Sequence, residues 1–139
     1  RHGITGAFAG ANLVYGCYDL SSTPAVRNWG DRNLVLSTPI VKWFTENYLP
    51  GMDREAMRDP DISPLYADLA GMPPALFTVG TLDMLLDDSM FMSARWRAAG
   101  NEAELRLYEE GIHAFNLFPG ALGQLCIAAQ VEFLRRVIA

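Results

Sequence analysis

Asp83 and His113 are the two residues whose types and positions best suit catalysis. Each follows a run typical of a β-strand, residues 75–79 before the aspartate and residues 103–108 before the histidine. A histidine can take a proton from a serine hydroxyl when a carboxylate holds its other ring nitrogen, because that contact fixes the tautomer and stabilises the imidazolium. The order of acid then base along the chain therefore predicts part of a Ser-His-Asp triad, with Asp83 orienting His113.

Each of these two residues also has a purely structural interpretation. An aspartate just before a helix can accept backbone N–H bonds and favours the positive end of the helix dipole, so Asp83 is equally well explained as a cap. Asp87 and Asp88 suit the first turn of the same helix, where we expect them to be mainly structural. His113, considered by itself, is a histidine in a surface loop.

Patterns of apolar residues and helix signals predict the elements that would position this pair. Strands are expected at residues 5–18, 75–80 and 104–108, and helices at residues 40–49, 86–99 and 122–137. Residues 52–74 are expected to form a connection with one turn near residues 65–69, and residues 109–120 a loop. Thr38 is the expected N-cap of the first helix, followed by Pro39 at the first helical position.

This order of elements predicts an α/β fold with a mostly parallel sheet and flanking helices. In such sheets ligands bind outside the carboxyl ends of the strands, where loops converge. Asp83 and His113 are both expected at these ends. The 139 residues suffice for one domain or part of one, and the hydrophobic share of 50% against 19% charged residues indicates apolar faces that cover something else.

Composition argues against several other classes of function. The net charge of −5 and the absence of a Lys/Arg cluster argue against nucleic acid as a partner. His2 and His113 are the only histidines and have no metal-ligand spacing, no glycine-rich phosphate loop opens a helix, and we expect no metal or other cofactor. Cys17 and Cys126 are expected to be buried, reduced thiols.

No apolar run approaches the roughly 18 residues of a membrane span, and no signal peptide is evident, so a cytoplasmic protein is expected. The chain starts at Arg1 without methionine, shortly before an apolar strand, and we therefore expect it to be a C-terminal piece.

Trp43, Phe44 and Tyr48 lie at helical spacing. We expect this stripe to pack in the core, with the lining of an apolar substrate channel as the alternative.

Read together, these motifs closely resemble the C-terminal half of the hormone-sensitive lipase family of α/β-hydrolase esterases. The resemblance extends over nearly the whole chain. It rests on Tyr15-Gly16-Cys17-Tyr18-Asp19-Leu20, Trp43-Phe44 with Tyr48-Leu49, Ser63-Pro64-Leu65, Leu69-Ala70-Gly71-Met72-Pro73-Pro74-Ala75, Gly80-Thr81-Leu82-Asp83 with Asp87-Asp88, Ala98-Ala99-Gly100, and Tyr108-Glu109-Glu110-Gly111-Ile112-His113-Ala114-Phe115.

The resemblance implies a role for several residues. Asp83 would be the triad acid, His113 the triad base, and Asp87 a support for the turn that carries the acid. Leu85 and Trp43 are candidates for the substrate pocket. Residues 1–139 would form the C-terminal portion of one α/β-hydrolase domain, with a cap segment at approximately residues 31–59 inserted between strands.

The sequence departs from the family pattern in four places. Asp88 stands where glutamate is usual, and Ala114 replaces the glycine of His-Gly-Phe. More seriously, the His-Gly-Gly oxyanion loop and the Gly-Asp-Ser-Ala-Gly nucleophile elbow of the family are both absent. No serine here, including Ser63, Ser89 and Ser93, lies in a Gly-x-Ser-x-Gly turn.

The resemblance thus implies a carboxylic ester hydrolase in the complete protein, acting on a small ester with a short or medium acyl chain. The expected partners are this substrate, the missing N-terminal half of the same fold, and a second copy of the chain as a homodimer. Two alternatives remain open: a non-catalytic receptor or binding module for a small ligand on the same fold, and an inactive truncated fragment.

Overall fold

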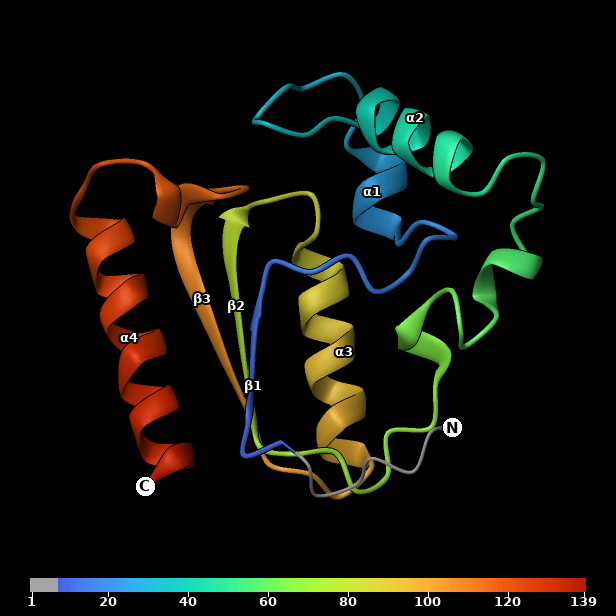
Figure 1. Ribbon diagram of the computed structural model, residues 1–139. Coiled ribbons are helices and arrows are strands. Elements are labelled where there is room, and N and C mark those ends of the chain that lie inside the picture. The colour runs from blue at the N-terminus through green and yellow to red at the C-terminus, as the bar shows by residue number, and fades with distance from the viewer. Residues whose placement is uncertain (1–7) are drawn as a thin grey trace.

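Three parallel strands form the centre of the protein in a computed structural model that describes residues 8–139. They are β1 (Ala11–Val14), β2 (Ala75–Leu82) and β3 (Ala103–Ile112), and they lie side by side in the order β1-β2-β3 (Figure 1). Both pairings are parallel. β2 is buried from Ala75 to Gly80, as expected for a central strand covered on both faces. The predicted parallel α/β architecture is confirmed.

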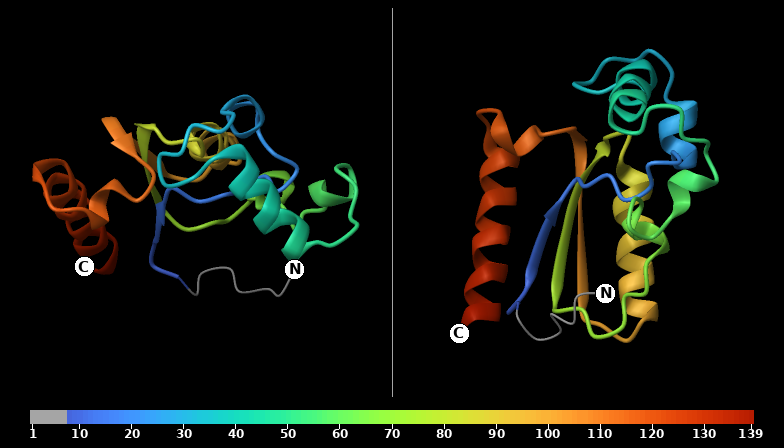
Figure 2. Two further views of the ribbon diagram at one scale, coloured as in Figure 1. Left: turned by 90° about the horizontal axis from the view of Figure 1, so that it is seen from above. Right: turned by 45° about the vertical axis from the view of Figure 1, so that its right-hand side comes forward.

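Two long helices cover opposite faces of this sheet. α3 (Leu86–Ala98) lies against one face and α4 (Ala121–Ile138) against the other, as Figure 2 shows. On the α3 side, Phe77 packs edge-on against Trp96 with ring centroids 5.6 Å apart. On the α4 side, Phe133 and Cys126 are buried. Among residues 8–139, no helix is both long enough and apolar enough to cross a bilayer.

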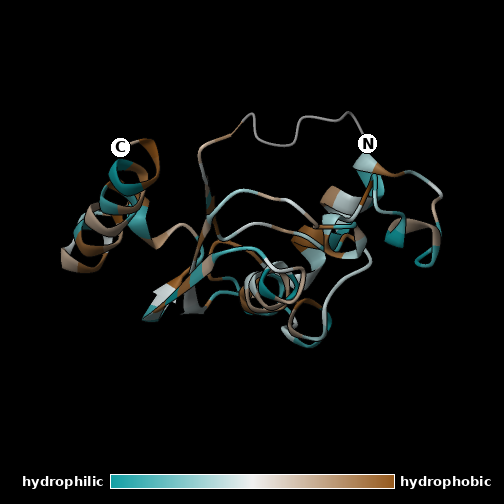
Figure 3. Ribbon diagram, turned by 90° about the horizontal axis from the view of Figure 1, so that it is seen from below, coloured by the Kyte–Doolittle hydropathy of each residue, from teal (hydrophilic) through white to brown (hydrophobic). Residues whose placement is uncertain are grey.

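α4 is only partly covered by the rest of the described structure. Hydrophobic and hydrophilic residues are interleaved along it (Figure 3). Leu125, Ile127 and Val131 on this helix are exposed, although they are large and apolar. The three strands therefore leave part of the apolar surface of this helix exposed.

The long connection between β1 and β2 lies largely beyond the carboxyl ends of the strands. It contains the helices α1 (Pro24–Asn28) and α2 (Thr38–Tyr48), which lie above the strand ends in Figure 1, and two short 3-10 helices, η1 (Ala56–Arg58) and η2 (Pro64–Tyr66). No residue of α2 is buried. α2 therefore packs on the rest of the fold without burying any of its side chains completely.

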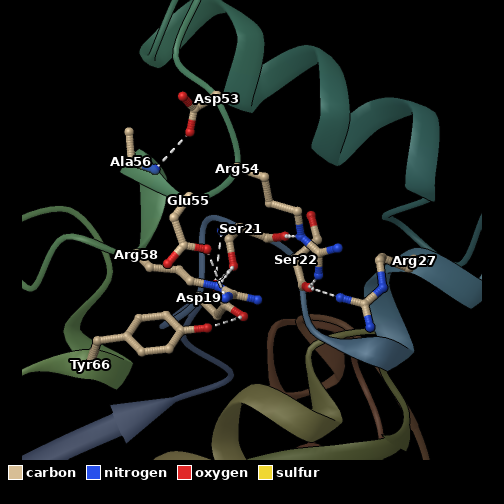
Figure 4. A network of polar contacts seen from close by, with 10 residues as sticks. All are labelled: Asp19, Ser21, Ser22, Arg27, Asp53, Arg54, Glu55, Ala56, Arg58 and Tyr66. Atoms are coloured by element: carbon tan, nitrogen blue, oxygen red, sulfur yellow. Dashed lines mark hydrogen bonds and ion pairs between the residues drawn. The ribbon is translucent and has the colours of Figure 1, made fainter.

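A polar network fastens the end of this connection to the loop after β1 (Figure 4). One carboxylate oxygen of Asp19 accepts hydrogen bonds from the backbone and the hydroxyl of Ser21, and the other accepts one from Tyr66. Arg54 and Arg58 donate to the backbone carbonyl and the hydroxyl of Ser21, respectively. Two segments more than thirty residues apart in sequence are therefore joined by side chains rather than by a strand pairing.

Asp88, in the first turn of α3, holds the same loop from the opposite side. Its Oδ1 accepts hydrogen bonds from the backbone N–H groups of Tyr18 (2.8 Å) and Asp19 (2.9 Å), and its Oδ2 accepts one from the Thr23 hydroxyl (3.0 Å). Desolvation raises the pKa of this buried carboxyl to about 6, although the hydrogen bonds oppose the rise. Asp88 is structural, as its sequence position predicts.

Several predicted boundaries differ from the structure. Residues 5–7 of the expected first strand lie outside the described residues, and β1 ends at Val14 because Tyr15 has a φ of +37°, which extended backbone does not allow. The N-cap of α2 is Ser37, since the backbone N–H of Thr38 donates to Gly30 and Thr38 is already helical. The expected loop at residues 109–120 begins later, because β3 continues to Ile112.

β2 and β3 approach each other very closely at two glycines. The pairing of the strands shifts register between Gly80 and Leu82, next to Gly111 on β3. A Cβ atom on Gly80 would collide with the backbone carbonyl of Gly111. Because backbone atoms cannot move aside as a flexible side chain can, only glycine fits here.

Gly80→Ala should therefore destabilise the chain by about 2–3 kcal/mol, since the clash forces strands apart in a close-packed core. Urea unfolding followed by circular dichroism measures this change. Gly51→Ala is a matched control, because a Cβ there meets no atom within 4 Å and only the positive φ of +73° opposes it. That control should cost about 1 kcal/mol. Equal losses in both variants would contradict the close-approach argument.

Asp88 should make stability depend on pH in a predictable direction. Its folded pKa, about 6, exceeds the model-compound value of 3.8, so protonation of Asp88 favours the folded state. This stabilisation is fully present below about pH 4 and is lost as the pH rises through 6. A rise of about two pH units corresponds to about 3 kcal/mol.

The measurement is the difference in unfolding free energy between the wild type and Asp88→Asn, a variant of similar shape that cannot ionise. We expect the wild type to lose up to about 3 kcal/mol relative to Asp88→Asn between pH 4 and pH 7. Other titrating groups cancel in this difference. A difference that is flat, or that grows in favour of the wild type with rising pH, would refute the assignment.

Candidate active site

The structure brings Asp83 and His113 into direct contact. Leu82 on β2 pairs with Ile112 on β3, so the residues that follow them, Asp83 and His113, leave neighbouring strands at the same level. The Nδ1 atom of His113 lies 2.9 Å from Oδ2 of Asp83. The register of two parallel strands thus places the acid beside the base, at the carboxyl end of the sheet.

The carboxylate of Asp83 is held by both of its oxygens. Its side chain is completely buried, and while Oδ2 binds His113, Oδ1 accepts a hydrogen bond of 2.9 Å from the backbone N–H of Leu85. The N-cap of α3 is Leu85 and not Asp83. The interpretation of Asp83 as the helix cap is therefore wrong: Asp83 closes the turn before the helix and also binds the imidazole.

The imidazole of His113 is partly accessible, with 18% of the side chain exposed. Because Nδ1 faces Asp83, Nε2 is the nitrogen left to exchange a proton with another molecule. The next residue, Ala114, has a φ of +60° and turns the chain into η3 (Phe115–Leu117). This left-handed conformation suits glycine, and alanine at position 114 adopts it at a cost of roughly 1 kcal/mol relative to glycine. His113 is not a free loop histidine.

Asp87 lies one helical turn after Asp83. Its Oδ2 accepts a hydrogen bond of 2.8 Å from the backbone N–H of Ala25 in α1. The first turn of α3 therefore carries two anchors, Asp87 for α1 and Asp88 for the loop before it. Both hold the connection in place over the strand ends.

An apolar cavity of about 420 Å³ opens beside this turn. Leu85 forms part of its wall, two residues from Asp83. Most of the remaining wall is also apolar and comes from the β1–β2 connection: Leu20, Leu36, Val41, Phe44 and Tyr48. Its size falls within the usual range of about 300–1,000 Å³ for small-molecule sites.

The aromatic stripe of α2 divides between the cavity and the solvent. Phe44 and Tyr48 line the cavity, whereas Trp43 does not; Trp43 is 59% exposed and packs edge-on against Phe44 at 5.1 Å. The interpretation of this stripe as packing is wrong for the described structure, because all three rings are exposed and two of them line the cavity. The prediction of Trp43 as a pocket residue is also wrong, since it lies outside the cavity wall.

Neither cysteine, and neither Ser63 nor Ser93, has the surroundings of a nucleophile. Cys17 lines the cavity and is exposed, contrary to the prediction of a buried thiol, whereas Cys126 is buried. Desolvation, with the nearby carboxylates of Asp88 and Asp19, raises the pKa of Cys17 to about 12, so it remains a thiol at neutral pH. The hydroxyls of Ser63 and Ser93 donate to backbone carbonyls.

Sequence reasoning missed part of this site. Cys17 and Leu20 reach the cavity only because the loop after β1 is pinned by Asp88, and no local pattern predicts that contact. The adjacent acids Asp87 and Asp88 were the available sequence signal for this contact. One carboxylate is enough to stabilise the start of a helix, so a second one suggests that the helix start also binds another segment. Within residues 8–139, no group of three or more metal-ligating side chains is arranged to hold an ion.

Comparison with known proteins shows the family to which this chain is related. Residues 2–117 match the family described as the alpha/beta hydrolase fold. An acetyl-hydrolase of Streptomyces hygroscopicus is 31% identical over 106 residues, which cover 75% of this chain and 34% of that protein. The carboxylic ester hydrolase LipN of Mycobacterium tuberculosis is 32% identical over 108 residues, covering 76% of this chain and 28% of LipN.

A solved structure shows the same arrangement of elements. A hormone-sensitive lipase from a metagenome library superposes with a TM-score of 0.76 at 31% identity, over 93% of this chain and 42% of that one. The chain spans about a third or less of the curated relatives described above. It belongs to the α/β-hydrolase family, and its relatives there include proteins named as ester hydrolases and a hormone-sensitive lipase.

Proposed function

We propose that the complete protein is a carboxylic ester hydrolase with a Ser-His-Asp triad, and that this chain supplies the acid, Asp83, and the base, His113. The observation that carries the proposal is the 2.9 Å contact between His113 Nδ1 and Asp83 Oδ2 at the ends of adjacent parallel strands. The nucleophilic serine and the oxyanion donors would come from a segment outside these 139 residues.

The geometry supports two successive proton transfers through His113. Nε2 of His113 takes the proton of the serine hydroxyl as its oxygen attacks the ester carbonyl, and Asp83 stabilises the resulting imidazolium through Nδ1. His113 then gives that proton to the departing alcohol, which leaves an acyl-serine. His113 then takes a proton from water as the water attacks the acyl-serine, and gives this proton to the serine oxygen as the carboxylic acid leaves.

The chain would form the C-terminal portion of one α/β-hydrolase domain, with residues from about 31 to 59 as the cap segment. Two observations support a missing half. Among the described residues β1 pairs only with β2, so its other edge is open, and the amide oxygen of Asn12 on that strand is buried without a hydrogen-bond partner. The exposed apolar residues of α4, such as Leu125, fit the same conclusion.

The substrate would be a small ester with a short or medium acyl chain, bound in the cavity beside Leu85. The wall is almost entirely apolar, and the hydroxyl of Thr45 is turned back to the carbonyl of Val41 at 3.0 Å. A hydrocarbon chain loses no hydrogen bond on entering such a space. An acyl chain therefore fits the cavity better than a charged or polar group does.

His113→Ala and Asp83→Asn should each lower kcat for p-nitrophenyl butyrate by at least about 10³-fold in the complete protein, because each removes the general base or its correct tautomer. Initial rates at saturating substrate measure the effect. Asp87→Asn is the matched control, since Asp87 binds the backbone of Ala25 and not the imidazole. It should change kcat by only a few-fold.

A His113→Ala protein that hydrolyses the ester within a few-fold of the wild-type rate would overturn the triad assignment. A complete protein that binds a small ligand tightly but turns over no ester would instead support a non-catalytic receptor on this fold.

Narrowing the cavity should shift the preference for acyl length. Thr45→Phe fills part of the space under α2 and should raise the ratio of kcat/KM for butanoate over octanoate esters by about 10-fold, because roughly two methylene groups lose their buried site. Trp43→Ala, on the same helix but outside the cavity, is the control and should leave the ratio unchanged. If the ratio changes in Trp43→Ala but not in Thr45→Phe, the acyl chain binds outside this cavity.

A further inference from the structure

Tyr15, the residue that follows β1, contacts the imidazole of His113 directly. The two ring centroids are 4.7 Å apart and the ring planes meet at 62°, an edge-to-face arrangement. Such pairs are favourable because the positive edge of one ring meets the negative face of the other. The contact joins the first and third strands of the sheet across the end of β2.

The backbone of Tyr15 is held in an unusual conformation. Its φ is +37°, a left-handed value that a large L side chain rarely adopts, and its N–H donates a hydrogen bond of 2.7 Å to the carbonyl of Thr78 on β2. Strain of this kind persists only where the surroundings fix it, and it gathers at functional sites. Glu110 and Ala114, on either side of His113, also have positive φ.

The phenol of Tyr15 is partly withdrawn from water, and this desolvation raises its pKa. The residue is thus held at its backbone by β2 and at its ring by the contact with His113.

Asp83 alone leaves one motion of the imidazole free. A single hydrogen bond at Nδ1 allows the ring to tilt about the line that joins this nitrogen to the carboxylate oxygen, and such tilting moves Nε2 sideways. A second contact on the ring removes this freedom. Displacement of a reacting atom by about 1 Å can cost on the order of 100-fold in rate.

We propose that Tyr15 is a positioning residue that fixes the plane of the His113 imidazole, so that Nε2 points toward the serine. The proposal rests on the proposed function of His113 as the triad base. Tyr15 touches neither the ester nor the serine in this role. It acts through His113, and the ring, not the hydroxyl, is the part that matters.

The test compares three variants of the complete protein, assayed with p-nitrophenyl butyrate. Tyr15→Phe keeps the ring and should retain kcat within about 3-fold. Tyr15→Leu removes the ring and should lower kcat about 10-fold with KM unchanged, the equivalent of one lost aromatic contact. Tyr15→Asn does the same with a residue that accepts positive φ readily, so it remains informative if the leucine variant does not fold.

Tyr66→Leu is the matched control. Tyr66 is a tyrosine of the same chain whose hydroxyl binds the side chain of Asp19, and it lies outside the cavity wall. Its loss should leave kcat within about 2-fold. If the control loses as much activity as Tyr15→Leu, or if Tyr15→Phe does, the ring-positioning role is overturned.

A spectroscopic measurement separates positioning from general destabilisation. The Nδ1 proton between His113 and Asp83 should give a low-field NMR signal in the wild type and in Tyr15→Phe, and this signal should broaden in Tyr15→Leu and Tyr15→Asn as the ring gains freedom. An unchanged signal together with unchanged kcat would refute the proposal. If His113→Ala itself retains activity, the proposed function fails instead, which is a different outcome.

Discussion

The pairing of Leu82 with Ile112 is the constraint on which the rest of the site depends. A shift of one residue in a strand turns every following side chain to the opposite face, so acid and base would leave the sheet on different sides. The pairing is fixed by the close approach of Gly80 and Gly111, just before the strands end. Two residues without side chains thus determine where two reactive side chains meet.

The first turn of α3 extends this order to the long connection between β1 and β2. Asp83 closes the turn, Asp87 binds α1, and Asp88 binds the loop after β1. Three carboxylates within six residues therefore tie His113, α1 and the loop after the first strand to one helix start. Concentrated negative charge at this position is tolerable because the positive end of the helix dipole and the backbone N–H groups face it.

Much of the fold could be predicted from sequence, and the reasons are local. Buried parallel strands appear as continuous apolar runs, so β2 and both long helices were located within a few residues. α1 could not be found, since its five residues carry no period and depend on Asp87 for anchoring. The acid and the base could be named from the strand ends that precede them, and their resemblance to a known family strengthened that prediction.

The rest of the site depends on contacts between distant segments, which leave no local trace. The contact of Tyr15 with His113 joins residues almost a hundred positions apart, and the position of Cys17 follows from a carboxylate seventy residues later. Trp43 illustrates the opposite error: helical spacing suggested that it shares a face with Phe44 and Tyr48, but only those two rings line the cavity.

α2 contributes side chains to the cavity wall, yet it buries none of its own residues. In most helices a substitution that alters the ligand-facing side also disturbs a packed core. Here the two constraints are separated, because the Asp83–His113 pair rests on the sheet while α2 rests on a few polar anchors. Mutations in α2 can therefore accumulate with little loss of stability, and the shape of the cavity can change without any change to Asp83 or His113.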